Sequence, residues 1–175
     1  MTEGIDLPPL ARGTQPAEAE RLARLDAAVP QILAALDGEL DAVAIEATLV
    51  CLLWEAMPWT NWVGFYRRTG ERLLTVGPYQ GTMGCLRIEF ERGVCGACAR
   101  TGEVQIVDDV HTRPDHIACD ARTRSELVLP VRDADGALRA VLDLDATHLA
   151  AFSRAEADRL ATLVAATLGK RGVRF

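Results

Sequence analysis

The chain has 175 residues, a length that suits one domain with a core large enough to fold without disulfide staples. Hydrophobic residues make up 49% of the sequence and charged residues 25%, shares that exclude a disordered or fibrous protein. The net charge is -6 at pH 7 and no run of Lys or Arg forms a basic stripe, so nucleic-acid binding is not expected as the main role.

Neither a signal peptide nor a membrane span is expected. The N-terminus carries no basic segment, and the most apolar stretch, residues 42–57, is interrupted by Glu46 and Glu55. The five cysteines are an odd number, which makes a permanent disulfide framework unexpected. We therefore expect a cytoplasmic protein with reduced thiols, in which any disulfide is transient and catalytic.

The predicted elements begin after an irregular lead-in over residues 1–15, and residues 16–175 are expected to form one domain. Apolar residues recur at helical spacing over residues 17–36 and predict a first helix. Pro30 lies inside this pattern and is expected to kink or split the helix.

A second amphipathic helix is predicted over residues 39–57, where Pro58 stops it. Its predicted buried face is marked by steps of three and four: Leu40, Val43, Ala47, Val50 and Trp54. Cys51 lies beside this face and is expected to pack in the core.

From residue 61 onward, the spacing of apolar residues is typical of β-strands. Strands are predicted over residues 61–66, 72–76, 86–90, 103–107, 125–132 and 138–144. A short helix over residues 94–100 interrupts them, and residues 108–120 read as a loop. A closing helix begins after Ser153, with Glu156 at the capping-box position, and runs to about Leu168. This order predicts an α+β fold with a mostly antiparallel sheet.

The cysteines allow three interpretations. Cys95 and Cys98 have the spacing of a zinc-ligand pair, and His111, His116 and Cys119 follow downstream, although a second clean pair is missing. The same Cys-x-x-Cys could be a thioredoxin-like redox centre, which would need a parallel βαβ unit that the pattern does not show.

In the third interpretation, Cys119 is a nucleophile and a thiol from elsewhere in the chain resolves it. Cys119 lies among polar residues, between His116 and Asp120, where a thiol can be reactive. A thiolate that attacks an electrophilic sulfur or oxygen becomes a sulfenic acid, which a second thiol converts to a disulfide. Spacing along the chain does not restrict that second thiol.

Aromatic and acidic residues favour the third interpretation. Trp62 and Tyr66 lie on one face of a predicted strand and could form the wall of a small pocket. Asp143 and Asp145 also share one face, and Glu126 is near the start of the partner strand of the same hairpin. Three converging carboxylates could bind an ammonium group and keep one acid protonated by mutual repulsion.

Seven short blocks of the sequence together resemble the free methionine-(R)-sulfoxide reductases, which are built on a GAF domain. The blocks are Asn61-Trp62-Val63-Gly64-Phe65-Tyr66, Gly77-Pro78-Tyr79-Gln80-Gly81, Gly93-Val94-Cys95-Gly96, Val110-His111, His116-Ile117-Ala118-Cys119-Asp120, Ser125-Glu126 and Leu142-Asp143-Leu144-Asp145. The resemblance covers roughly residues 20–165. It implies a GAF-like α+β fold and thioredoxin-dependent reduction of free methionine sulfoxide, with no cofactor and no metal.

The resemblance also implies a role for each matching residue. Cys119 would be the nucleophile, Cys85 the main resolving cysteine and Cys95 a second thiol of the relay. The implied substrate-binding residues are Trp62, Tyr66, Glu126, Asp143 and Asp145. Cys98 is a thiol added to the family pattern, and its part in the relay is left open.

A different class of protein is the alternative, because many GAF domains are sensors that bind a small ligand without catalysis. A sensor passes its signal to an output domain, and we do not expect 175 residues to include one. A sensor also has no need for three cysteines in these blocks. The sequence leaves the oligomeric state open between a monomer and a homodimer.

Overall fold

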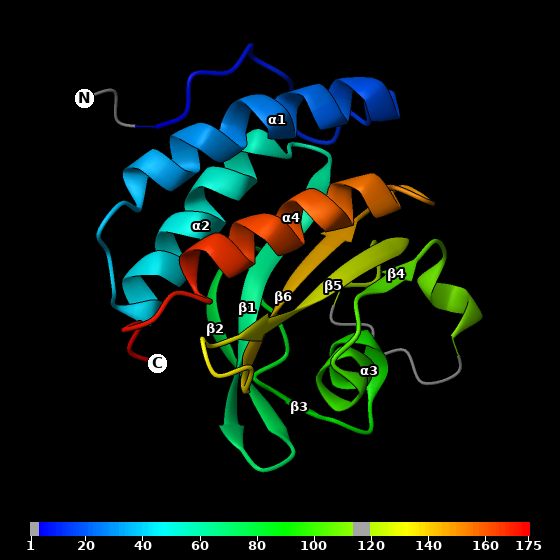
Figure 1. Ribbon diagram of the computed structural model, residues 1–175. Helices are drawn as coiled ribbons and strands as arrows, with labels where there is room; N and C mark the ends of the chain where they lie inside the picture. The colour runs from blue at the N-terminus through cyan, green and yellow to red at the C-terminus, as the bar shows by residue number, and fades with distance from the viewer. Residues whose placement is uncertain (1–3, 114–119) are drawn as a thin grey trace.

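The computed structural model describes residues 4–113 and 120–175 (Figure 1). Its elements, in chain order, are α1 (Glu18–Ala35), α2 (Ala42–Ala56), β1 (Thr60–Gly70), β2 (Leu73–Gly81), β3 (Arg87–Glu89), α3 (Gly93–Thr101), β4 (Gln105–Val107), the 3-10 helix η1 (Val110–Thr112), β5 (Ser125–Arg132), β6 (Leu138–Ala146) and α4 (Arg154–Thr167). Every predicted helix and strand is found, with shifted boundaries. The predicted α+β class is confirmed.

The six strands form one antiparallel sheet in the order β3-β2-β1-β6-β5-β4. Two hairpins, β1–β2 and β5–β6, are joined through the β1–β6 pairing at the centre of the sheet. The strands that carry the predicted aromatic and acidic residues are therefore neighbours.

The two faces of the sheet carry different layers (Figure 1). Helices α1, α2 and α4 lie together over one face, and α3 packs on the other against β5 and β6. The larger core fills the space under the three helices and includes Leu25, Ile45, Phe65, Leu142 and Leu160. A smaller cluster on the α3 face includes Trp62, Tyr66, Cys95, Val128 and Val141. The candidate site lies on this second face.

Pro30 does not split α1, which continues to Ala35. A proline inside a helix removes the hydrogen bond to the carbonyl four residues earlier, here that of Asp26. Pro30 and Asp26 are both exposed, so water can solvate that carbonyl. The predicted split of the helix at Pro30 is wrong for this reason.

The face of α2 that was predicted to be buried is correct only in part, because Val50 is buried as predicted but its neighbours along that face are not. Val43, Ala47 and Cys51 are exposed, whereas the buried positions include Ile45, Leu49 and Leu53. Almost every residue of α2 is apolar, so periodicity identifies the helix but does not determine which side meets the sheet. Cys51 is consequently a surface thiol and not part of the core.

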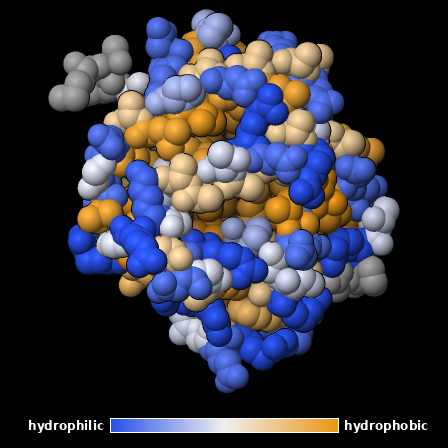
Figure 2. Space-filling view, in the orientation of Figure 1, coloured by the Kyte–Doolittle hydropathy of each residue, from blue (hydrophilic) through white to orange (hydrophobic). Residues whose placement is uncertain are grey.

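Hydrophobic and hydrophilic residues are interspersed over the face that Figure 2 shows. Met83 and Leu86, on the segment between β2 and β3, are 74% and 60% exposed, more than the other large hydrophobic residues recorded as exposed among the described residues. Within that part of the chain, no helix is long and apolar enough to cross a membrane.

Candidate active site

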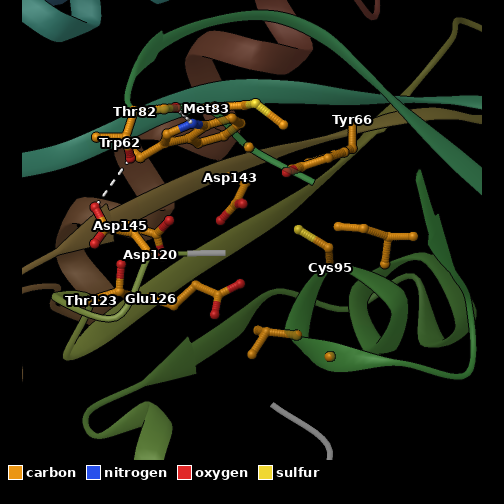
Figure 3. Close-up of a pocket in the computed structure, with 14 residues that line it drawn as sticks. Trp62, Tyr66, Thr82, Met83, Cys95, Asp120, Thr123, Glu126, Asp143 and Asp145 are labelled. Atoms are coloured by element: carbon orange, nitrogen blue, oxygen red, sulfur yellow. Dashed lines mark hydrogen bonds between the residues drawn. The ribbon is translucent and has the colours of Figure 1, made fainter. Parts of the chain in front are cut away.

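Three carboxylates converge on the α3 face of the sheet. Asp143 and Asp145 project from β6 to this face, because the alternating Leu142 and Leu144 belong to the larger core on the other side. Glu126 of β5 is paired directly opposite Asp145. Figure 3 shows the three acids around a common space. The structure thus brings together the acids that the sequence predicted to share one face.

Burial controls the ionisation of these acids. Asp143 is only 5% exposed, and burial raises its pKa to about 7, against the effect of hydrogen bonds with Cys95 and Glu126. Its Oδ1 atom has no hydrogen-bond partner. Burial also raises the pKa of Asp145 well above its usual range, and repulsion from Asp143 and Asp120 adds to the rise. The cluster can therefore hold a proton at neutral pH.

An aromatic wall borders the acids. Trp62, Gly64 and Tyr66 alternate onto the same face of β1, and the Trp62 ring stacks on Tyr66 with 5.5 Å between ring centroids and on Tyr79 with 5.3 Å. The Trp62 indole N–H donates a hydrogen bond of 3.0 Å to the Thr82 carbonyl oxygen. A Cβ at Gly64 would come within 2.5 Å of the Trp62 ring, so glycine is required for this stacking. The wall is rigid and apolar, as a thioether or methyl group would require.

The Tyr66 hydroxyl connects this wall to the segment that carries Cys85. It forms a hydrogen bond with the Cys85 backbone, while burial and then the charge of Asp143 raise the pKa of Tyr66. A Cβ at Gly84 would lie 2.9 Å from the same hydroxyl. The backbone at residues 84–85 is therefore held directly against the pocket wall.

Helix α3 presents Cys95 to the acids. The helix begins at Gly93, whose φ of +66° lies in the left-handed region that favours glycine. Gly96 lets the helix approach β3, because a Cβ there would be 2.5 Å from the Glu89 carbonyl oxygen. Cys95 is buried and lines the pocket, and burial followed by the charge of Asp143 raises the pKa of its thiol. At rest this cysteine is a protonated thiol.

Cys98 has a different environment, although it lies on the same short helix. Its side chain is fully buried in the smaller hydrophobic cluster and is not among the pocket residues. Burial raises the pKa of Cys98 well above that of an ordinary thiol. Both Cys95 and Cys98 are free thiols. We interpret Cys98 as a packing residue.

Asp120 anchors the chain directly after Cys119. Its carboxylate accepts hydrogen bonds from Thr82 Oγ1 at 3.1 Å, Asn61 Nδ2 at 3.3 Å and the Arg122 guanidinium at 2.8 Å. The bond from Arg122 is the main reason why the pKa of Asp120 is lowered. This carboxylate is therefore ionised and joins the start of β1, the end of β2 and the turn before β5 at one point of the pocket rim.

These groups enclose one pocket. It is lined by Trp62, Tyr66, Thr82, Met83, Gly84, Ile88, Gly93, Val94, Cys95, Asp120, Thr123, Glu126, Asp143 and Asp145 (Figure 3). The cavity volume is about 40 Å³. A pocket with one apolar wall and one acidic wall is suited to a small amphipathic cation.

Among the described residues, Cys85, Cys98 and His111 were also singled out from the sequence, and they are not pocket-lining residues. Cys119 and His116 lie outside the described residues. Cys85 is disulfide-bonded, in contrast to the three free cysteines recorded elsewhere in the described chain. His111 is exposed and pairs with Asp109, 3.1 Å away.

Four polar or flexible pocket residues were not identified from the sequence: Thr82, Met83, Asp120 and Thr123. Asp120 was visible as the neighbour of Cys119 in its motif, and this was the one signal that could have found it. Thr82 and Met83 follow the strand-ending Gly81, whose φ of +124° turns the chain toward the pocket.

The sequence pattern of the GAF domain matches residues 44–170. Free methionine-R-sulfoxide reductase from Saccharomyces cerevisiae is 38% identical over 73% of this chain and 74% of the relative, and the enzyme of that name from Escherichia coli is 39% identical over 75% and 79%. The X-ray structure of free methionine-R-sulfoxide reductase from Neisseria meningitidis, in complex with its substrate, has a TM-score of 0.80 and 38% identity over 90% of this chain and 92% of that one.

These findings define a GAF-domain fold of the type seen in known oxidoreductases. The chain belongs to the GAF-domain family and, within it, to the free methionine-R-sulfoxide reductases.

Proposed function

We propose that the protein reduces free L-methionine-(R)-sulfoxide to methionine. The observation that carries this proposal is the pocket in which Glu126, Asp143 and Asp145 face the stacked Trp62 and Tyr66. The acids suit the ammonium group and the sulfoxide oxygen of a free amino acid, and the rings suit its methyl end. The relatives named above act on this substrate by name, which supports the same assignment here.

The first chemical step is attack of the Cys119 thiolate on the sulfoxide sulfur. In net terms the sulfur–oxygen bond of the substrate breaks and the oxygen passes to Cys119, which is oxidised by two electrons to a sulfenic acid, while the substrate sulfur is reduced by two electrons and methionine leaves. The oxygen needs a proton, because oxide is a very poor leaving group. Asp143 is the proposed donor, since burial raises its pKa to about 7 and leaves it largely protonated in slightly acidic solution.

Cys85 then condenses with the sulfenic acid, releases water and forms a Cys85–Cys119 disulfide. The support for Cys85 is that its sulfur is disulfide-bonded in the structure while Cys95 and Cys98 are free. Cys95 is a second thiol of the relay, disfavoured at first because burial raises its pKa. Thioredoxin then reduces the disulfide, and we place the reaction in the cytoplasm, where that reductant keeps thiols reduced.

A coupled assay with thioredoxin, thioredoxin reductase and NADPH tests the activity. Free methionine-(R)-sulfoxide should cause NADPH oxidation, with one methionine formed for each NADPH consumed. Omission of thioredoxin should stop turnover after the first disulfide has formed. If neither NADPH oxidation nor methionine is observed, even in the first turnover, the reductase proposal is contradicted. If methionine forms in the first turnover but the enzyme is not recycled, only the proposed role of thioredoxin as the reductant is contradicted.

Replacing Cys98 with alanine should leave the rate of reduction within about twofold of wild type. The thiol is fully buried and outside the pocket, so the expected cost is a small cavity and about 1 kcal/mol of stability. Steady-state kinetics and urea unfolding measure the two effects. A loss of turnover matching that of Cys85→Ser would instead make Cys98 a member of the relay.

Asp143→Asn should lower turnover about 100-fold and at the same time stabilise the fold at pH 8. Because burial raises the folded-state pKa from 3.8 to about 7, the folded protein holds a proton that the unfolded chain releases. The contribution of Asp143 to wild-type stability is therefore most favourable below about pH 4 and falls as the pH rises to about 7. The variant should gain on the order of 2–4 kcal/mol at pH 8 and nothing at pH 4, measured by urea unfolding.

Glu46→Gln is the matched control for this variant. Glu46 of α2 is fully buried, neither carboxylate oxygen has a hydrogen-bond partner, and Arg67 Nε lies 3.6 Å away. Burial raises its pKa to about 7 as well, but Glu46 faces the larger core on the opposite side of the sheet. The control should show the same pH-dependent gain in stability with unchanged turnover. A loss of turnover in both variants would remove the special role of Asp143.

A further inference from the structure

Cys95, Glu126 and Asp143 form a compact group of potential metal ligands. The Cys95 Sγ and one carboxylate oxygen from each acid lie within 4.8 Å of one another, and all three residues are buried. They come from α3, β5 and β6, so three separate elements hold them in place. Figure 3 shows the three side chains around the same space.

A second observation indicates that this group has an unused ligand atom. Asp143 is 5% exposed, its Oδ1 has no hydrogen-bond partner, and the residue lines the pocket. A buried polar atom without a partner is unfavourable unless a ligand satisfies it. A bound cation would supply that partner.

The donor set determines which cations would fit. One sulfur and two carboxylate oxygens match borderline ions such as Zn²⁺, which takes Cys, Asp and Glu ligands in tetrahedral sites. Ideal ligand atoms around zinc are about 3.5 Å apart, so side-chain rotations of about 1 Å would close the group. The fourth position would be taken by water, because within the described parts of the chain three residues are grouped in this way.

We propose that the pocket binds one thiophilic divalent cation of the Zn²⁺ class through Cys95, Glu126 and Asp143. The cation would occupy carboxylates that the substrate needs, so it would act as an inhibitor and not as a cofactor. This site differs from the Cys95-x-x-Cys98 zinc pair considered from the sequence, because Cys98 is not part of the group.

Cadmium binding tests this proposal with a readout that does not depend on activity. A cadmium–thiolate bond produces an ultraviolet charge-transfer band, and the protein is used with Cys85 in its disulfide, as in the structure. Titration of Cd²⁺ should give a band that saturates at about one equivalent and that Zn²⁺ removes by competition. Cys95→Ser should abolish the band.

Matched variants test whether another thiol produces the cadmium–thiolate band. Cys98→Ser, three residues further along the same helix, and Cys51→Ser, on the exposed side of α2, should both retain the band and the affinity. If Cys95→Ser does not fold, Asp143→Asn decides the matter, since it should weaken Cd²⁺ binding at least about tenfold. Equal loss of the band in Cys95→Ser and Cys98→Ser, or unchanged affinity in Asp143→Asn, would overturn the proposal.

Discussion

Cys119→Ser is expected to release no methionine, whereas Cys85→Ser should release about one methionine per active site and then stop. The first step of the proposed reaction needs only the nucleophile and a proton, and both survive the loss of Cys85. The following step needs a thiol that can reach the sulfenic acid. Mixing enzyme with excess free methionine sulfoxide, without thioredoxin, and measuring methionine by rapid quench separates the two variants.

Cys51→Ser is the control, because Cys51 is an exposed thiol of α2 on the other side of the sheet. It should turn over like the wild type. Peptide mapping of the oxidised wild type should show a Cys85–Cys119 disulfide. Equal burst amplitudes for the Cys119 and Cys85 variants would contradict the division of labour, and a Cys95–Cys98 disulfide as the only product would favour the thioredoxin-like interpretation.

The sequence predicted the fold because its local signals agree with one another. The hairpin turn at Asp133 to Gly136 fixes the pairing of β5 with β6, and that register places Glu126 beside Asp145. Alternation along β6 then decides that both aspartates face away from the larger core. Three carboxylates could thus be placed together from two neighbouring strands alone.

Contacts between distant segments could not be predicted in the same way. The approach of Cys95 to Asp143 depends on how α3 docks on the sheet, and no periodic pattern encodes that orientation. The same holds for Asp120, whose partners Thr82 and Asn61 come from the end of β2 and the start of β1. Such polar contacts between loops depend on the completed fold and not on local spacing.

The buried acids also explain why this site costs stability. Asp143 and Asp145 are both held where burial raises their pKa, and an apolar pair at these positions would fold more favourably. Substrate binding offsets this cost only if the ligand brings a positive charge to the cluster. The preference for a free amino acid over a blocked one follows from the same electrostatics.

N-acetyl-methionine-(R)-sulfoxide should therefore be reduced about 1000-fold more slowly than the free amino acid, as judged by kcat/KM. Acetylation removes the ammonium charge. The buried acids then have no cationic partner, which lowers the stabilisation of the bound substrate by about 3–5 kcal/mol. The acetyl group also adds bulk beside the buried acids that line the pocket. Free methionine-(S)-sulfoxide is the stereochemical control and should remain unreacted, because its oxygen points away from the acid when its sulfur faces the nucleophile. Comparable kcat/KM values for the free and acetylated R-sulfoxides would show that Glu126, Asp143 and Asp145 do not enclose the ammonium group.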